Sequence, residues 1–166
     1  AVVKALGATV FMTELSPLRR AKAIEAGVAD EAFNPAEVDV VEECMKRTDG
    51  RGVDVAFECS SVQPVLDTCM QAAAPGAVLV IVSIWGHRSD FDMHKLVMKE
   101  LDMRGTIAYA HTHPKTVKLV ESGNIDLKPF ITGRIGLDNL IDEGFDSLIN
   151  HNETAVKILV SPTSQS

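Results

Sequence analysis

The chain has 166 residues, of which 46% are hydrophobic and 23% charged, a balance that excludes a disordered or coiled-coil protein and allows one hydrophobic core. Its formal net charge of −7 excludes nucleic acid and an anionic membrane as expected partners, because both require clustered Lys and Arg side chains. No apolar run reaches the roughly 18 residues that a membrane span needs. Cys44, Cys59 and Cys69 lack the close spacing of zinc ribbons or disulfide frameworks, so we interpret them as reduced thiols in a cytoplasmic protein.

The first strand signal is the apolar run of residues 7–13, which is followed by a lone carboxylate, Glu14. Residues 1–6 are typical of the end of a helix, which Gly7 closes in a left-handed cap. An acid at the carboxyl end of the second strand of a dinucleotide-binding βαβ unit accepts hydrogen bonds from the hydroxyls of the adenosine ribose. Its charge repels a 2′-phosphate, so Glu14 predicts a preference for NAD over NADP. The alternative, a solvated acid at a strand-helix junction, stays open on position alone.

The glycine-rich phosphate loop that precedes such an acid is missing from the sequence. It is expected roughly 20 residues before the acid, and counting back from Glu14 runs past residue 1. The nearest later approximation, Gly50-Arg51-Gly52, lacks the third glycine. We therefore expect an α/β fold with an incomplete doubly wound (Rossmann-type) parallel sheet that lacks its first strand and its glycine-rich loop. Because that strand is the central one, two interior edges would be open, and we expect another segment or another chain to fill the gap.

Local signals define the next elements. Ser16 is a suitable helix cap and Pro17 suits the first helical position, so a helix is predicted over residues 17–26. The apolar positions expected to face inward are Leu18, Ala21 and Ile24. The periodicity then predicts a strand, a helix, a strand and a helix: residues 31–34, 37–47, 53–59 and 64–74.

Residues 77–84 form the most hydrophobic run of the chain. The run is continuous rather than alternating, which is typical of a strand in a parallel sheet covered on both faces, so we expect it to be central. Downstream we predict helices at 93–99, 114–122 and 138–149, and strands at 102–108, 131–135 and 156–160. In the last helix, the residues expected to face inward are Leu140, Ile141, Phe145 and Leu148. Strands and helices alternate as far as Ala108, which predicts one domain over residues 1–108 and a separate segment over residues 109–166.

Several runs that follow one another along the chain resemble a known family. They are Arg51-Gly52-Val53-Asp54-Val55-Ala56-Phe57-Glu58, Pro75-Gly76, Lys99-Glu100-Leu101, Arg104-Gly105-Thr106-Ile107-Ala108, Glu143-Gly144-Phe145 and Val156-Lys157-Ile158-Leu159-Val160. Together they resemble the C-terminal half of the zinc-dependent medium-chain alcohol and polyol dehydrogenases. Within that family the likeness is to the 2,3-butanediol dehydrogenase group, and it covers essentially the whole chain.

The resemblance implies an NAD-binding Rossmann-type domain over residues 1–108 and a C-terminal segment, 109–166, that returns to the catalytic lobe. It implies that Glu14 holds the adenosine ribose, with Arg19 over it from the following helix. The other residues expected to line the cofactor groove are Cys59 and Ser60, then Val82, Ser83 and Ile84 beside the nicotinamide, and Thr106, Ile107 and Ala108 near its carboxamide. These positions follow strands at their carboxyl ends, where an open α/β sheet binds its ligand.

Each of these residues also has an ordinary structural interpretation. Arg19 suits a solvated helix surface, since Arg is mostly exposed in any fold. Val82 and Ile84 suit packing in any such sheet, and Glu58 suits a helix-capping or structural acid.

The resemblance also implies the reaction and its partners. The full-length enzyme would oxidise a secondary alcohol or vicinal diol, a small-molecule substrate, with NAD and a zinc ion whose ligands lie outside this chain. Within the chain we predict no catalytic residue and no metal ligand. No nucleophile motif is present, and His87, His94, His111 and His113 lack a neighbouring Cys or acid at ligand spacing. The chain alone is therefore expected to be inactive.

Two alternatives stay open. In the first, the complete enzyme keeps the reaction but acts on sorbitol or threonine, because the residues that select the substrate would lie largely in the missing half. The chain could instead be a non-catalytic oligomerisation module, since strands such as residues 77–84 offer apolar edges for pairing between subunits. The same edges lead us to expect a homo-oligomer.

Overall fold

The computed structural model describes residues 1–163, which form two compact units. One unit combines Ala1–Ala36 with the chain from Pro114 onward, and the other is Glu37–His113. None of the helices between residues 1 and 163 has both the length and the apolar character that a membrane span needs. The predicted α/β class with parallel sheets is confirmed, and each unit is described by itself below.

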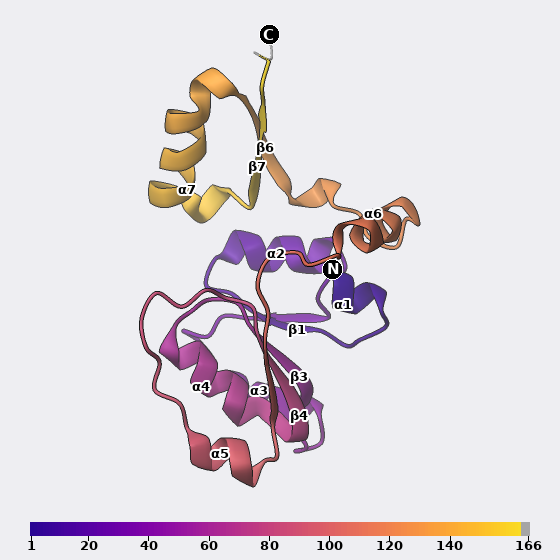
Figure 1. Cartoon of the computed structure of the whole chain (residues 1–166), viewed down its shortest axis with the longest axis vertical. Coiled ribbons are helices and arrows are strands. Elements are labelled where there is room, and N and C mark those ends of the chain that lie inside the picture. The colour runs from indigo at the N-terminus through magenta and orange to yellow at the C-terminus, as the bar shows by residue number, and fades with distance from the viewer. Residues whose placement is uncertain (164–166) are drawn as a thin grey trace. The chain divides into compact units, whose positions relative to one another are not determined.

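The unit Glu37–His113 is built on a three-stranded parallel sheet with strand order β3-β4-β5. The strands are β3 (Val53–Glu58), β4 (Ala73–Ile81) and β5 (Asp102–Gly105), and the helices are α3 (Val40–Arg47), α4 (Gln63–Ala72) and α5 (Met93–Met98). Helices α3 and α4 pack together beside β3 (Figure 1). As its hydrophobic run predicts, β4 is the central strand, and Leu79 on it is fully buried.

Several elements of this unit differ in their bounds from the predictions; β5, for example, ends at Gly105 rather than at residue 108. Helix α3 begins at Val40 rather than at residue 37, because the Asp39 side chain caps it by accepting a hydrogen bond from the Glu42 amide at 3.1 Å. Strand β4 ends at Ile81, so Val82, Ser83 and Ile84 lie in the loop beyond it rather than in the strand.

The turn from α4 into β4 is held by Lys99, the residue directly after α5. The Nζ atom of Lys99 donates to the carbonyl oxygens of Met70 at 3.1 Å and of Gln71 and Ala73 at 2.7 Å. These carbonyls lie at the end of α4, where backbone oxygens have no partner within the helix. The chain becomes extended at Ala73, before the predicted end of the helix at residue 74.

Residue 52 must be glycine because its backbone lies very close to the same turn. Its φ is +92°, and a Cβ atom at this position would lie 2.5 Å from the Ala72 carbonyl oxygen and 2.8 Å from the Ala74 nitrogen. Any other residue would therefore have to move the backbone between α4 and β4.

In the other unit, β1 (Phe11–Thr13) pairs in parallel with β2 (Glu31–Phe33). Helix α1 (Val2–Ala5) precedes β1, and α2 (Pro17–Glu25) connects the two strands. Ser16 caps α2 as predicted, accepting from the Arg19 amide at 3.4 Å. The inward face predicted for α2 is wrong in part: Ala21 and Ile24 are exposed, and Ala23 is the buried residue.

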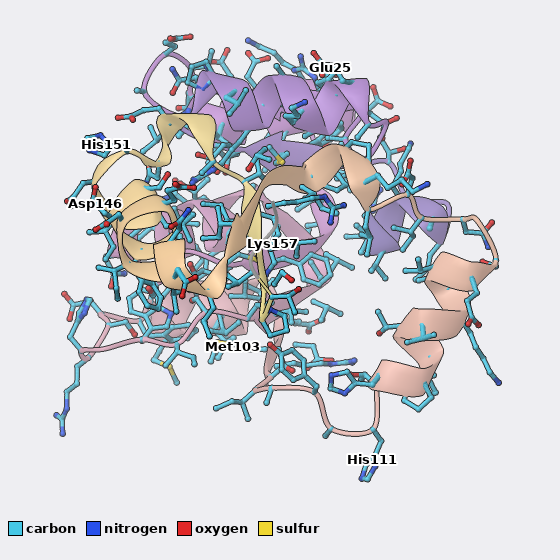
Figure 2. The ribbon with its side chains drawn as sticks, turned by 90° about the horizontal axis from the view of Figure 1, so that it is seen from above. Glu25, Met103, His111, Asp146, His151 and Lys157 are labelled. Atoms are coloured by element: carbon cyan, nitrogen blue, oxygen red, sulfur yellow. The ribbon has the colours of Figure 1, made fainter. Side chains whose placement is uncertain are left out.

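The same unit contains α6 (His113–Glu121), which begins at the boundary, and a second parallel pair, β6 (Ile131–Gly136) with β7 (Lys157–Ser161). The remaining elements are η1 (Lys128–Phe130), η2 (Leu137–Asn139), η3 (Leu140–Asp146), α7 (Ser147–Asn150) and η4 (Asn152–Thr154). Figure 2 shows Asp146 and His151 together at the end of this segment, where the carboxylate and the imidazole Nε2 lie 3.7 Å apart.

The continuous α-helix predicted over residues 138–149 is wrong. A 3₁₀ turn leads into the π-helix η3, and only the last turn is α-helical. Because the wider π turn rotates the side chains away from a 3.6-residue register, Ile141 and Phe145, which were expected to face inward, are exposed at 66% and 52%. The buried residue is Gly144, whose backbone lies against Ile135 and Leu140.

In the described part of the chain, the strand pairing leaves β1 and β3 each with an unpaired edge. Among residues 1–163, β1 pairs only with β2, and β3 pairs only with β4. A doubly wound sheet without its first strand is expected to leave both of these edges unpaired.

Candidate cofactor-binding site

Glu14 follows β1 directly, at the carboxyl end predicted for it. Its Oε1 atom accepts a hydrogen bond from the Ser16 amide at 2.9 Å and lies 3.7 Å from Nη1 of Arg19. The side chain is about one-quarter exposed, at 26%. Within the described residues, Oε2 receives no hydrogen bond, so one carboxylate oxygen remains available to the hydroxyl groups of a ribose.

The two arginines after Glu14 have different roles. Arg19 lies between the Glu14 carboxylate and the carbonyl oxygen of Ala155, which its Nη2 reaches at 3.4 Å. Arg20 donates from Nη1 to the carbonyl oxygens of Glu14 at 2.6 Å and Leu15 at 2.7 Å. Arg20 therefore holds the end of β1, while Arg19 is the cation beside the carboxylate.

The other predicted cofactor-binding residues lie in the unit Glu37–His113, at one edge of its sheet. The register pairs Glu58 of β3 with Ile81 of β4, and Ile81 with Gly105 of β5, so the three strands end together. Backbone hydrogen bonds continue past the strands, from Val82 N to Glu58 O at 2.9 Å and from Thr106 N to Ile81 O at 3.1 Å. The segments that follow these three strands therefore begin at the same edge of the sheet: Cys59 and Ser60, Val82, Ser83 and Ile84, and Thr106, Ile107 and Ala108.

Most of these residues present their side chains to solvent. Ile84 and Ile107 are 78% and 75% exposed, far more than packing inside a sheet would leave. Cys59, Ser60 and Val82 are also exposed, and Ser83 is partly buried. Exposed apolar side chains at the carboxyl edge of a parallel sheet are suited to contact a planar aromatic ligand.

Glu58, the last residue of β3, is fully buried although it is ionisable. Its Oε1 atom accepts from the Ser60 amide at 2.7 Å, the Ser60 hydroxyl at 2.8 Å and the Ser61 amide at 2.8 Å. Its Oε2 atom accepts from the Ser83 hydroxyl and from Nε1 of Trp85 at 3.1 Å. A buried carboxylate with this many donors is satisfied without an ion pair.

These contacts decide the charge of Glu58. Burial raises the pKa of the carboxyl group, but the hydrogen bonds from Ser83, Ser60 and Ser61 outweigh burial and hold the pKa of Glu58 below its ordinary value of 4.5. Glu58 is therefore an ionised carboxylate at neutral pH. Its charge in turn adds to burial in raising the pKa of the Cys59 thiol.

The cysteines are free thiols. Burial raises the pKa of Cys69 to about 12, with smaller contributions from Glu58 and the other cysteines, so this group is a protonated thiol rather than a nucleophile. Cys44 is buried, and Cys59 is the exposed member of the three.

The residues present do not fit a zinc ion. Between residues 1 and 163, no three His, Cys, Asp or Glu side chains gather at a distance that would hold a metal. His87 instead packs against Trp85, with ring centroids 5.6 Å apart, and His113 packs against Tyr109 at 5.1 Å.

The sequence reasoning missed three members of this arrangement: Arg20, Ser61 and Trp85. No sequence motif predicts the role of Arg20. The acid of Glu58 at the end of an apolar strand, followed by two serines, was a usable signal for a local carboxylate–amide turn. Trp85 lies 27 positions from Glu58 along the chain, so only the pairing of β3 with β4 brings them together.

The chain belongs to the zinc-binding dehydrogenase family, whose family model matches residues 1–122. The parallel sheet with its open edges and the clustered strand ends are the corresponding part of that fold.

Several proteins similar to this chain are named as butanediol dehydrogenases. The chain is 60% identical over 162 residues, 98% of its length, to a (R,R)-butanediol dehydrogenase of Neisseria gonorrhoeae, and 40% identical over 96% of its length to a (R,R)-butanediol dehydrogenase of Bacillus subtilis. The X-ray structure of 2R,3R-butanediol dehydrogenase from Bacillus subtilis matches with a TM-score of 0.88 and 40% identity over 97% of this chain. In each comparison the chain spans 46% of the length of the relative.

Proposed function

We propose that this chain is the cofactor-binding half of an NAD-dependent zinc alcohol dehydrogenase that oxidises a secondary alcohol or vicinal diol, such as butane-2,3-diol, to the ketone. The observation that carries the proposal is the 60% identity over 98% of the chain to a protein named (R,R)-butanediol dehydrogenase. In this proposal residues 1–108 belong to the NAD-binding domain and residues 109–166 return to the catalytic lobe. The zinc ligands lie outside this chain.

In this proposal, different residues bind the two ends of the coenzyme. Glu14 accepts the ribose hydroxyls through its free oxygen, while Ser16 and Arg19 fix the orientation of its carboxylate. A phosphate at the 2′ position would meet the Glu14 charge, which supports NAD as the coenzyme. The exposed residues after β3, β4 and β5 contact the nicotinamide. When bound, NAD accepts a hydride from the alcohol carbon.

The open edge of β3 needs a partner strand in the complete protein. A strand from another segment or another subunit pairs with it in parallel, since an exposed edge otherwise recruits other chains. We expect the complete protein to be a homo-oligomer. Size measurement of the purified protein by light scattering tests this expectation.

The deciding experiment uses the whole protein that the gene encodes, with zinc, NAD and butane-2,3-diol. NADH absorbance is expected to appear with this diol, and more slowly or not at all with sorbitol or threonine. Residues 1–166 expressed alone are expected to give none. Activity only with sorbitol or threonine would mean that butane-2,3-diol is not the substrate. If no diol or polyol gave NADH and calorimetry detected no NAD binding, the result would favour the oligomerisation module.

A further inference from the structure

A single buried carboxylate connects two of the loops at the carboxyl edge of the sheet. Through Oε1, Glu58 holds Ser60 and Ser61 in the loop after β3. Through Oε2, it holds Ser83 and Trp85 in the loop after β4. Each loop thus donates to a different oxygen of the same rigid group.

We propose that Glu58 is a positioning residue that sets the separation of these two loops and thereby holds the nicotinamide end of the bound coenzyme. The inference rests on the proposed function and deepens it, because that function assigns the nicotinamide to the neighbours of Glu58. Glu58 itself is 0% exposed, so it acts through the loops and not by touching the ligand.

The backbone of the first loop supports this role. Ser61 has φ +57°, a left-handed conformation that a residue with a side chain rarely adopts. Such a conformation persists where the surroundings hold it. Here the Ser61 amide donates to Glu58 at 2.8 Å and the Ser61 hydroxyl donates to the Ser60 carbonyl oxygen at 2.6 Å, so the carboxylate is one of two restraints on the turn.

The chemistry of the five donors explains why a carboxylate is needed. A carboxylate accepts on both oxygens, whereas the isosteric glutamine accepts on one and donates from the other. If the glutamine oxygen keeps Ser60 and Ser61, its amide group faces Ser83 and Trp85. The Ser83 hydroxyl can rotate and accept, but the Trp85 indole N–H can only donate. In Glu58→Gln, the new amide group is therefore expected to repel the indole N–H of Trp85.

The adenosine end of the coenzyme provides an internal reference. Glu14 is held by Ser16 and Arg19, whereas the donors to Glu58 come from Ser60, Ser61, Ser83 and Trp85. ADP-ribose lacks the nicotinamide, so its affinity should not depend on the Glu58 network, whereas the affinity for NADH should.

The experiment measures the dissociation constants of NADH and ADP-ribose by isothermal titration calorimetry on the whole encoded protein. The variants are Glu58→Gln, Trp85→Phe and the double variant Glu58→Gln/Trp85→Phe. Asp54→Asn is the matched control, because Asp54 lies on the same strand, is exposed and contacts Arg51 instead. Circular dichroism and the melting temperature establish that each variant is folded.

Glu58→Gln is expected to weaken NADH binding about tenfold or more and to leave ADP-ribose within about twofold. Trp85→Phe is expected to weaken NADH about threefold, since one donor of the network is lost. The double variant should return to the Trp85→Phe value, because the repulsion between two donors is gone. Asp54→Asn should bind both ligands as the wild type does.

Three results would overturn the inference: unchanged NADH binding by Glu58→Gln, equal weakening of NADH and ADP-ribose, or no recovery in the double variant. If Glu58→Gln does not fold, the NADH affinity of Trp85→Phe is the test. An affinity of Trp85→Phe equal to that of the wild type would count against the inference. A wild-type protein that binds neither ligand would instead overturn the proposed function, and the inference with it.

Discussion

The ammonium group of Lys99 lies 2.7 Å from the carbonyl oxygen of Ala73, the residue at which α4 gives way to β4. Two more carbonyl oxygens at the end of the helix, those of Met70 and Gln71, accept from the same nitrogen. A cation here both satisfies the last carbonyls and complements the negative end of the helix dipole. This arrangement gives a physical reason for a lysine in the run Lys99-Glu100-Leu101.

Replacing Lys99 by Met is expected to lower the free energy of unfolding by about 1–3 kcal/mol, because three backbone acceptors lose their donor. Urea unfolding followed by circular dichroism measures this loss. Lys95→Met is the control, since within residues 1–163 the Lys95 ammonium group pairs only with Asp92, at 3.6 Å, and its loss should change stability by less than about 0.5 kcal/mol. Equal effects at the two positions would mean that the cap contributes little.

Gly52→Ala should destabilise the protein by about 2–4 kcal/mol, since the new Cβ meets the Ala72 carbonyl oxygen and φ is positive. Gly50→Ala separates the two causes. Gly50 has φ +76° and open space around its Cβ position, so it should lose only about 1–2 kcal/mol. The melting temperature and urea midpoint measure both. If the two variants lost the same stability, the close approach at Gly52 would not be the cause.

Coenzyme choice is expected to depend on the charge of Glu14. Glu14→Gln should weaken NAD binding several-fold and improve NADP binding about tenfold, because the repulsion of the 2′-phosphate disappears and Arg19 becomes free to pair with it. Calorimetric titration with both coenzymes measures the ratio. Glu25→Gln, at the other end of α2 (Figure 2), is the matched control, and its ratio should equal that of the wild type. An unchanged ratio in Glu14→Gln would count against Glu14 as the selecting residue.

The Glu58 network is expected to stabilise the protein at neutral pH and to lose that contribution in acid. The folded-state pKa of Glu58 lies below 4.5, so its contribution is present above the unfolded pKa and disappears as pH falls through the folded pKa. The difference in urea midpoint between the wild type and Glu58→Gln should therefore be largest near about pH 7 and shrink below about pH 4.5. A constant difference across this range would show that the carboxylate charge is not responsible.

The thiols should react in the order of their exposure and pKa. Iodoacetamide followed by mass spectrometry is expected to modify Cys59 first, even though burial and the Glu58 charge raise its pKa. Cys69, with a pKa of about 12, should react only when the protein unfolds. Early modification of Cys69 would contradict the raised pKa of its partly buried thiol.

Some of this architecture was predictable because its signals are local. The Ser16-Pro17 pair places the start of α2, and the uninterrupted apolar run over residues 77–84 identifies the central strand. The lone acid after β1 is likewise visible in the sequence. In each case the residues that form the feature are neighbours along the chain.

Other features depend on contacts that no local pattern encodes. The donors that hold Glu58 come from loops after two different strands, so its burial follows from the pairing of β3 with β4. The π-helix η3 breaks the periodicity that placed Ile141 and Phe145 inside. Its apolar residues predicted an amphipathic α-helix, whereas the helix packs against its neighbours through Gly144.

The parallel pairing of this sheet also has a kinetic consequence. A parallel neighbour cannot be joined by a tight hairpin, so β3 meets β4 only after α4 has crossed between them, and β4 meets β5 only after α5. Chain entropy must be lost over each crossover before any ladder hydrogen bond forms, which makes refolding slow and leaves nascent strands exposed to aggregation. Recovery of this chain after dilution from denaturant should therefore fall as protein concentration rises.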